Sequence, residues 1–292
     1  MTKGWKASQA EYKEELASRN NLMIVDGLNL GFRFQGQVKK PFASNYLNTV
    51  QSFAKSYSAR DTIILSDKGV STFRKNIHEG YKGQRAERNK NKTEEEKEQT
   101  RLFFEYFEEA YELASTVFPC FRYRGVEADD MAGVIVALAI MYGNYDTIWL
   151  ISTDGDWDTL LQATVKRFSY KTRREYTVES MYEEHGVDTV EQFISLKAIM
   201  GDPGDSINGV DGIGAKRGYS IIREYGSVMD IIDSMPLPGK QQFIKNLNNS
   251  EDLLLRNIQL VDLPSFSAEA LEAAGVYKEF YEQIKEIVSA KA

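Results

Sequence analysis

The stretch that decides the fold is GVEADDMAGVIVALAIMYGNYDTIWLISTDGDWDTLL, residues 125–161. Residues 131–143 within it are apolar on almost every side, which is typical of a helix buried between other layers. Residues 148–152 form a short apolar run of the length expected for a buried parallel strand. A buried helix that leads into a buried strand is a unit of α/β proteins, so the stretch predicts this fold class.

Two apolar runs upstream, residues 21–25 and 62–65, complete the strand pattern. An aspartate follows each of them, Asp26 and Asp67, just as Asp154 follows the strand at 148–152. Sites in open parallel α/β sheets form at the carboxyl ends of the strands. We therefore expect a mostly parallel central sheet, flanked by helices, with these aspartates gathered at one edge.

Nine carboxylates in five short clusters are the candidate site. They are Asp26, Asp67, Glu127, Asp129, Asp130, Asp154, Asp156, Asp202 and Asp205. Like charges in one pocket cannot all stay ionised without cations, and clusters of oxygen ligands suit Mg²⁺ or Mn²⁺. The clusters predict a metal-dependent phosphodiesterase.

Other interpretations of single acidic residues stay open. A lone aspartate after a strand, such as Asp26, is commonly a turn residue or a helix cap. Asp129 and Asp130 fit the first turn of a helix, where the helix dipole favours negative charge. Asp158 fits the start of a short helix over residues 159–163 and is left out of the candidate site.

Composition permits this function. The chain has 292 residues, 42% of them hydrophobic, which is enough for one large core or two ordinary ones. The net charge is −7, but outside the nine candidate ligands Lys and Arg slightly outnumber Asp and Glu, so a polyanionic partner is not excluded. The single cysteine, Cys120, excludes an intrachain disulfide and a multi-cysteine zinc site. A membrane span and a signal-peptide core are both lacking, which predicts a cytoplasmic location.

Residues 78–101 interrupt the apolar pattern, and their first half is basic. Composition alone fits a solvated or disordered insertion. The position fits a basic segment above the metal site that grips a strand backbone, with Tyr81 available to stack on a base. An amphipathic helix is predicted next, over residues 102–118.

The second half contains a predicted hairpin around residues 171–174 and is helical after it. Within residues 209–226, Gly212 and Gly214 permit the sharp turn of a helix-hairpin-helix unit, whose backbone N–H groups can hold a phosphate. Two cations follow in the next helix, Lys216 and Arg217. Their positive charges would strengthen binding to the phosphates of nucleic acid.

Three further points concern function. His78 and His185 are the two histidines, and we interpret both as surface or loop residues outside any Ser–His pair. A metal-dependent ribonuclease or general phosphodiesterase on a similar α/β scaffold would also explain the carboxylates. A non-catalytic protein that binds DNA junctions and merely carries a metal ion is the remaining alternative.

The whole chain resembles the flap endonucleases and 5′-to-3′ exonucleases of the structure-specific 5′-nuclease superfamily, particularly those of T-five-like bacteriophages. The resemblance is carried by MIVDG (23–27), YKGQR (81–85), GVEADDMA (125–132), WLISTDGDWDTLL (149–161), FISLKAIMGD (193–202) and GIGAKRGY (212–219).

The resemblance implies a PIN-like nuclease domain over residues 21–185, after a polar N-terminal extension (1–20). This domain would include a helical arch at 78–118. A helical helix-hairpin-helix (H3TH) DNA-binding domain would follow over residues 186–292.

The resemblance also implies an activity. A monomer would cut DNA at 5′ flaps, junctions and ends during replication and repair, leaving 5′-phosphate and 3′-hydroxyl groups. Two Mg²⁺ ions would serve the reaction, Mn²⁺ would be able to replace them, and the H3TH turn would hold K⁺. The partner would be DNA with a single-stranded 5′ arm and a duplex.

Roles for individual residues follow from the same resemblance. One metal would be held mainly by Asp26, Asp67, Glu127, Asp129 and Asp130, and the other mainly by Asp154, Asp156, Asp202 and Asp205. Tyr81 would stack on a base, Lys82 and Arg85 would contact the scissile phosphate, and Lys197, Gly212, Gly214, Lys216 and Arg217 would hold DNA. The chain departs from the family pattern at Pro203 and at Ser206, where an asparagine is usual, so the local geometry of these positions is open.

Overall fold

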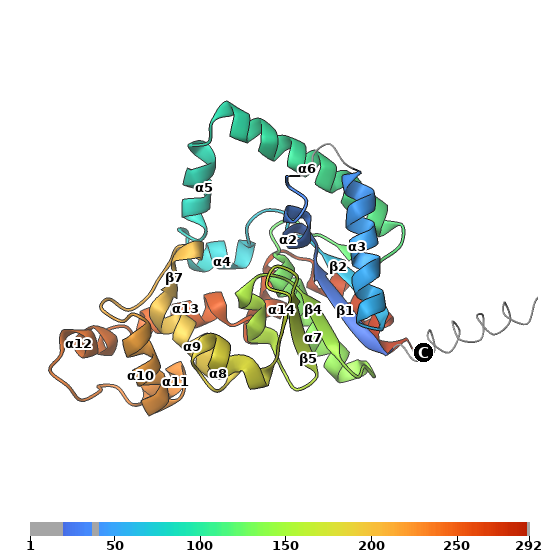
Figure 1. Cartoon of the computed structure of the whole chain (residues 1–292). Helices are drawn as coiled ribbons and strands as arrows, with labels where there is room; N and C mark the ends of the chain where they lie inside the picture. The colour runs from blue at the N-terminus through green and yellow to red at the C-terminus, as the bar shows by residue number, and fades with distance from the viewer. Residues whose placement is uncertain (1–19, 37–40, 291–292) are drawn as a thin grey trace, which may run out of the picture.

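A computed structural model describes residues 20–36 and 41–290, and the proposed extension at 1–20 therefore lies almost wholly outside the described residues (Figure 1). Its centre is a six-stranded sheet of order β3-β2-β1-β4-β5-β6. The strands are β1 (Asn21–Asp26), β2 (Ala59–Leu65), β3 (Cys120–Phe121), β4 (Ile148–Ile151), β5 (Val165–Ser169) and β6 (Arg174–Tyr176). The first five in this order are parallel and β6 is antiparallel, which confirms both the predicted sheet and the hairpin.

Strand register explains why the aspartates meet. Asp26 pairs with Leu65 of β2, and Val25 pairs with Ile151 of β4, so the three strands end at nearly the same level. Asp67 and Asp154 follow β2 and β4 within three residues. Their backbones therefore leave the sheet at the edge where Asp26 stands.

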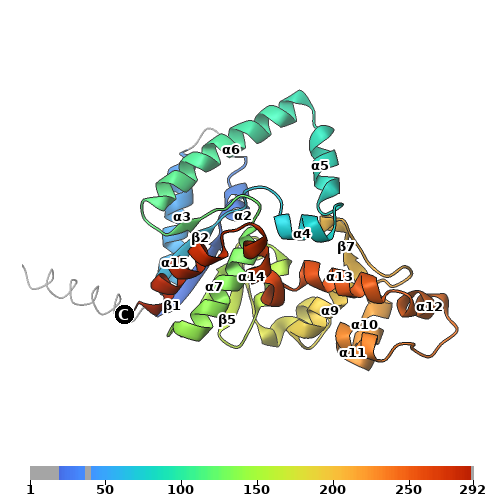
Figure 2. The same ribbon diagram turned by 180° about the vertical axis from the view of Figure 1, so that it is seen from behind.

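Helices cover both faces of the sheet (Figures 1 and 2). Successive side chains of β1 point to opposite faces of the sheet and so pack against the two helical layers. Leu22 and Ile24 belong to a core with α7 (Ala128–Tyr142), α14 (Leu263–Ala273) and α15 (Tyr277–Ser289). Met23 and Val25 belong to a core with α2 (Gly27–Phe32), α3 (Phe42–Ser56) and α6 (Glu94–Ser115). The predicted buried helix at 131–143 is α7, and it begins three residues earlier.

The compositional break forms the helical arch that rises from the body of the molecule in Figure 1. After α4 (Thr72–Ile77), the arch consists of α5 (Gly83–Lys90) and the first part of α6. The disordered interpretation is therefore wrong, and so is the predicted helix start at residue 102. Thr93 and Glu96 form a capping box, in which each side chain bonds the other's backbone N–H, and this starts α6 at Glu94.

A third core belongs to the helices that follow the sheet. They are α8 (Met181–His185), α9 (Val190–Met200), α10 (Ala215–Tyr225), α11 (Val228–Asp233), α12 (Gln242–Asn248) and α13 (Glu251–Val261). Between α9 and α10 lies a small hairpin of β7 (Gly201–Asp202), the 3₁₀ turn η3 (Pro203–Asp205) and β8 (Ile207–Asn208). Among the described residues, none of the helices has the length and hydrophobicity of a membrane span.

Candidate active site

A cavity of about 220 Å³ lies at the carboxyl ends of β1, β2 and β4. Eight of the nine predicted carboxylates line it: Asp26, Asp67, Glu127, Asp129, Asp154, Asp156, Asp202 and Asp205. Lys82 and Arg85 from the arch line it as well. Segments separated by more than a hundred residues therefore meet in one strongly acidic space.

Backbone N–H groups and a serine fix the carboxylates at the sheet edge. Asp26 accepts a hydrogen bond from the Asn29 N–H (3.2 Å) at the start of α2, and one from the Ser152 hydroxyl (2.8 Å). Asp67 accepts the Ala128 N–H (2.6 Å) at the start of α7. Both aspartates thus act as helix caps, as the open alternative allowed for Asp26, and both also line the cavity.

The second group of carboxylates is held by a lysine. The Lys197 Nζ lies 2.7 Å from Asp156 Oδ1 and 3.0 Å from Asp202 Oδ2. Asp202 also caps η3 through the Gly204 N–H (2.9 Å). The Lys197 side chain is 14% exposed and its charge faces the two carboxylates, while its contact with DNA stays a prediction. This geometry makes it an organiser of the acidic site.

Burial and mutual repulsion raise the pKa of several of these groups. Burial, followed by the charge of Asp67, raises the pKa of Asp26 well above its usual value. Burial and the charge of Glu127 raise the pKa of Asp67 to about 6. Burial also acts to raise the pKa of Glu127, but Lys82 and Arg74 outweigh it and leave this pKa below its ordinary value. The ionised form of most of these carboxyl groups is therefore disfavoured in the cavity, and bound cations would stabilise it.

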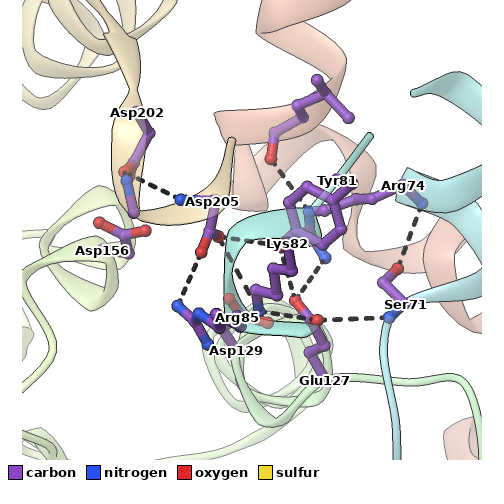
Figure 3. A network of polar contacts seen from close by, with 12 residues as sticks. Ser71, Arg74, Tyr81, Lys82, Arg85, Glu127, Asp129, Asp156, Asp202 and Asp205 are labelled. Carbon is purple, nitrogen blue, oxygen red and sulfur yellow. Dashed lines mark hydrogen bonds and ion pairs between the residues drawn. The ribbon is translucent and has the colours of Figure 1, made fainter. Parts of the chain in front are cut away.

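Tyr81 and Lys82 connect the arch to the carboxylates (Figure 3). The Tyr81 hydroxyl lies 2.9 Å from Glu127 Oε2 and 3.0 Å from Asp205 Oδ2. Its side chain is 2% exposed and packs in the third core, so the expectation that Tyr81 stacks on a base is wrong for this conformation. Lys82 Nζ lies 2.7 Å from Glu127 Oε1, facing the cavity.

Arg85 is the more accessible of the two arch cations. Its Nη2 lies 2.7 Å from Asp205 Oδ1, and about half of its side chain is exposed. Figure 3 shows the Asp205 carboxylate joined by dashed lines to Arg85 and to the pair formed by Tyr81 and Lys82. Both cations therefore line the acidic cavity, and their contact with a scissile phosphate stays a prediction.

Asp130 is the predicted carboxylate that does not line the cavity. Arg74 binds both of its oxygens, at 2.7 Å and 2.8 Å, and the side chain of Asp130 is fully buried. One of its oxygens still lies within 4.8 Å of oxygens of Glu127 and Asp129. Because each oxygen accepts a bond from the guanidinium and the side chain stays outside the cavity, the geometry favours a role in holding Arg74 over metal ligation.

The hairpin turn lies at the surface of the helical part. Gly212 has a φ of 79°, a left-handed conformation that glycine adopts without strain. Gly214 has a φ of −99°, so the turn needs glycine at only one of the two predicted positions. Lys216 and Arg217 are exposed at the start of α10, and Arg217 donates a hydrogen bond back to the Gly212 carbonyl.

Sequence reasoning missed a buried polar cluster around Asp158. The predicted short helix at 159–163 is instead a 3₁₀ turn, η1 (Gly155–Leu160), and Asp158 inside it is completely buried. Arg167 binds both Asp158 oxygens at 2.6 Å and 2.7 Å, and His185 Nε2 lies 2.8 Å from Oδ2. His185 is thus partly buried rather than a surface residue. Little in the sequence signals this pair, because Arg167 lies at the start of the predicted hairpin, whereas in the structure it is the buried third residue of β5.

The fold and site define a carboxylate-lined α/β domain joined to a helical hairpin domain, and comparison with known proteins identifies the family. The family model described as the 5′-3′ exonuclease N-terminal resolvase-like domain matches residues 21–186. The 5′-3′ exonuclease C-terminal SAM fold matches residues 188–274. The chain belongs to the 5′-3′ exonuclease family.

Relatives support the assignment. The chain is 60% identical to the flap endonuclease of Escherichia phage T5, over 98% of this chain and 99% of that protein. It is 30% identical to a 5′-3′ exonuclease of Bacillus subtilis, over 81% of each chain. It is 27% identical to the DNA polymerase I of Bacillus subtilis over 90% of this chain, which spans 31% of that polymerase.

Solved structures agree. The T5 D15 flap endonuclease in a pseudo-enzyme–product complex with DNA and metal ions has a TM-score of 0.89 at 61% identity, covering 92% of this chain and 100% of that one. T5 5′-exonuclease with bound zinc has a TM-score of 0.88 at 60% identity, with the same coverage. The Rad2 catalytic core with DNA substrate has a TM-score of 0.51 at 16% identity, covering 95% of this chain and 94% of that one, and shares the fold.

Proposed function

We propose that the chain is a structure-specific 5′ nuclease that acts as a monomer in the cytoplasm, which would be that of the host cell if a phage encodes the chain. It hydrolyses DNA phosphodiesters at 5′ flaps, junctions and ends, and leaves 5′-phosphate and 3′-hydroxyl groups. The observation that carries the proposal is the convergence of eight carboxylates and two arch cations on one cavity, in a chain of this family. Its relatives include a flap endonuclease and a 5′-3′ exonuclease.

The donor set fits two divalent metal ions. Eight carboxylates surround a space in which Lys82, Arg85 and Lys197 supply three positive charges, leaving a large negative excess that two divalent ions nearly balance. Oxygen ligands favour Mg²⁺, with Mn²⁺ as a substitute. The ligands of one ion would be Asp26, Asp67, Glu127 and Asp129, and those of the other Asp154, Asp156, Asp202 and Asp205. When bound, the ions would supply an activated water and would neutralise charge on the phosphate.

Lys82 and Arg85 provide the protein's own electrostatic contribution. Both reach the cavity from the base of the arch, where a phosphate at the carboxylate edge would lie between them and the acidic side chains. Positive groups that are already fixed in the site stabilise the charge that develops on a transferring phosphate. No covalent enzyme intermediate is needed for this role.

A groove of about 370 Å³ between α2 and the arch fits a single-stranded arm. Phe32 is 47% exposed and Phe104 is 42% exposed, and both line this groove together with Lys92 and Lys97. Exposed aromatic rings are platforms for bases, and the lysines offer positive charge to the phosphates. We propose that the 5′ arm passes along this groove.

The exposed turn at Gly212 and the start of α10 is the proposed contact for duplex DNA. Backbone N–H groups at a helix start attract a phosphate, and Lys216 adds a positive charge beside them. The proposed DNA-binding domain is the helical part after residue 185, although α14 and α15 pack against α7. A K⁺ ion at the turn stays a prediction.

The test is cleavage of a 5′-flap DNA and of a linear single strand of equal sequence, with Mg²⁺ or with EDTA. We expect metal-dependent cutting near the flap junction by the natural protein, and none by Asp154→Asn. Asp146→Asn is the matched control, because Asp146 is exposed and does not line the cavity.

Each alternative has its own outcome. Equal cutting of both substrates would favour a general phosphodiesterase. Junction binding without cutting would favour a non-catalytic binder, and either result would refute the proposal.

A further inference from the structure

The arch base, residues 78–85, is hydrogen-bonded to the β7–β8 loop, residues 203–206, although more than a hundred residues separate the two segments. The Lys82 N–H donates to the Asp205 carbonyl at 2.8 Å. His78 Nε2 lies 2.9 Å from the Ser206 carbonyl, which assigns the imidazole proton to this nitrogen. The Gln84 N–H donates to Ser206 Oγ at 3.3 Å. These bonds involve the main chain of both segments, so they fix backbone positions.

Both sides of this junction adopt an uncommon backbone conformation. Lys82 has a φ of 55° and Ser206 a φ of 62°, in the left-handed region that disfavours residues with a Cβ atom. Such conformations persist where the surrounding contacts over-determine them. Two of them in direct proximity indicate that the junction is held by more than local preference.

Ser206 supplies what α5 lacks at its first turn. Lys82 occupies the N-cap position of α5, and its side chain makes no cap because it extends to Glu127. The Ser206 hydroxyl instead accepts the N–H of Gln84, the second helical residue, which is the bond a capping serine normally makes within its own chain segment. The helix of eight residues, GQRAERNK, has no large apolar side chain that could anchor it by packing. Short helices without such packing are marginal in water.

We propose that Ser206 is a positioning residue for the arch: it caps α5 from the helical domain and, together with His78, sets Lys82 and Arg85 at the acidic cavity. The inference rests on the proposed function only for its effect on turnover. The β7–β8 loop leads directly into the hairpin turn at residues 209–214, so the surface proposed to hold duplex DNA and the arch base share one short connection.

The first test follows amide hydrogen exchange in α5 of the DNA-free protein, for Ser206→Ala and Ser206→Gly. Loss of the capping bond should speed exchange of the first-turn amides of α5 by about five- to tenfold in both variants. The glycine variant relieves the left-handed backbone, so an effect seen only with alanine would assign it to backbone conformation and overturn the cap. Ser52→Ala on α3 is the control, because Ser52 is exposed and far from the junction in sequence.

The second test measures flap cleavage and duplex affinity of the same variants. We expect kcat to fall by at least fivefold, with duplex affinity within twofold of the natural protein. Equal losses in kcat and duplex affinity would indicate general damage to the helical domain and overturn the positioning role. Unchanged exchange in α5 would overturn it as well.

His78→Ala provides an independent variant if the Ser206 variants fold poorly. This substitution removes the bond to the Ser206 carbonyl and keeps the bond from the Gln84 N–H to the Ser206 hydroxyl. We therefore expect faster amide hydrogen exchange in the arch base. Exchange at the natural rate would refute the junction. If the natural protein cuts no DNA, the proposed function fails, whereas the exchange experiment still decides the role of Ser206.

Discussion

Replacing Arg74 with methionine should destabilise the protein strongly, although Arg74 lies outside the cavity. Its guanidinium binds Asp130 through two hydrogen bonds and donates a third, from Nε to the Leu260 carbonyl at 3.0 Å. Arg74 therefore joins α4, α7 and α13 through one side chain. Methionine keeps the volume of the aliphatic stem and removes the charge.

The magnitude follows from what the substitution leaves behind. Asp130 is fully buried, so its carboxylate would lose its partner without gaining water. Removing one partner of a buried ion pair costs about 3–5 kcal/mol. Burial already raises the pKa of Asp130, and without Arg74 the carboxyl would take up a proton, which limits the loss. The thermal midpoint should fall by roughly 10 °C.

The assay is urea unfolding of the metal-free protein at neutral pH. Arg122→Met is the matched control, because the Arg122–Glu108 pair has similar geometry but Glu108 is 48% exposed. An exposed pair contributes at most about 1 kcal/mol. If Arg74→Met lost no more stability than Arg122→Met, the energetic argument would be refuted.

The same pair tests whether Asp130 ligates metal. Asp130→Asn should lower stability and leave Mn²⁺ affinity within about twofold, because its oxygens serve Arg74. Asp129→Asn should leave stability nearly unchanged and weaken Mn²⁺ binding, since Asp129 lines the cavity. Mn²⁺ titration followed by electron paramagnetic resonance measures both, and equal losses of affinity would restore Asp130 to the ligand set.

Four further predictions concern single side chains. Lys82→Ala should slow cleavage by roughly 10²–10³-fold with duplex binding nearly intact, and equal losses in rate and binding would contradict its role at the phosphate. Lys216→Ala should weaken duplex binding and reduce the salt-dependence slope by about one unit, whereas an unchanged slope would remove Lys216 from the interface. Phe104→Ala should weaken binding of a flap with bases by about 1–3 kcal/mol but not binding of an abasic flap. Fluorescence anisotropy titrations of both proteins with both flaps would measure these affinities. Burial raises the pKa of Asp67 from 3.8 to about 6, so its contribution to the stability of the metal-free protein is present at pH 3.8 and below and is lost as the pH rises through about 6. Urea midpoints between pH 4 and 7 measure this, and Asp67→Asn should flatten the dependence.

The sheet and the meeting of the carboxylates were predictable because both follow from local pattern and a topological rule. Apolar runs of strand length predict parallel strands, and their carboxyl ends share an edge. The start of α6 was predicted wrongly because residues 94–101 have no apolar face to show helical periodicity. The capping-box pattern at Thr93 and Glu96 was a local signal that would have placed it.

Pairings of buried charges could not be derived in this way. Asp130 and Asp158 look like the other aspartates in sequence, and only their tertiary partners, Arg74 and Arg167, distinguish them. Tyr81 looks exposed in its polar surroundings, yet its hydroxyl lies within hydrogen-bond distance of two carboxylates and its ring enters a core. The contacts of Arg74 and Tyr81 span more than forty residues, and even the Asp158–Arg167 pair, nine residues apart, joins a 3₁₀ turn to a strand, so spacing alone does not predict these roles.

Asp205 shows why the two domains form one functional unit. It comes from the helical domain, yet its carboxylate lines the cavity and meets Tyr81 and Arg85 of the arch. A fragment ending near residue 186 would lose Asp205 and Asp202, half of one proposed metal site, together with the Ser206 cap of α5. Its arch cations would then face the remaining carboxylates without the loop that orders them. The acidic cavity, the arch and the DNA-binding turn therefore depend on the single connection between β7 and α10.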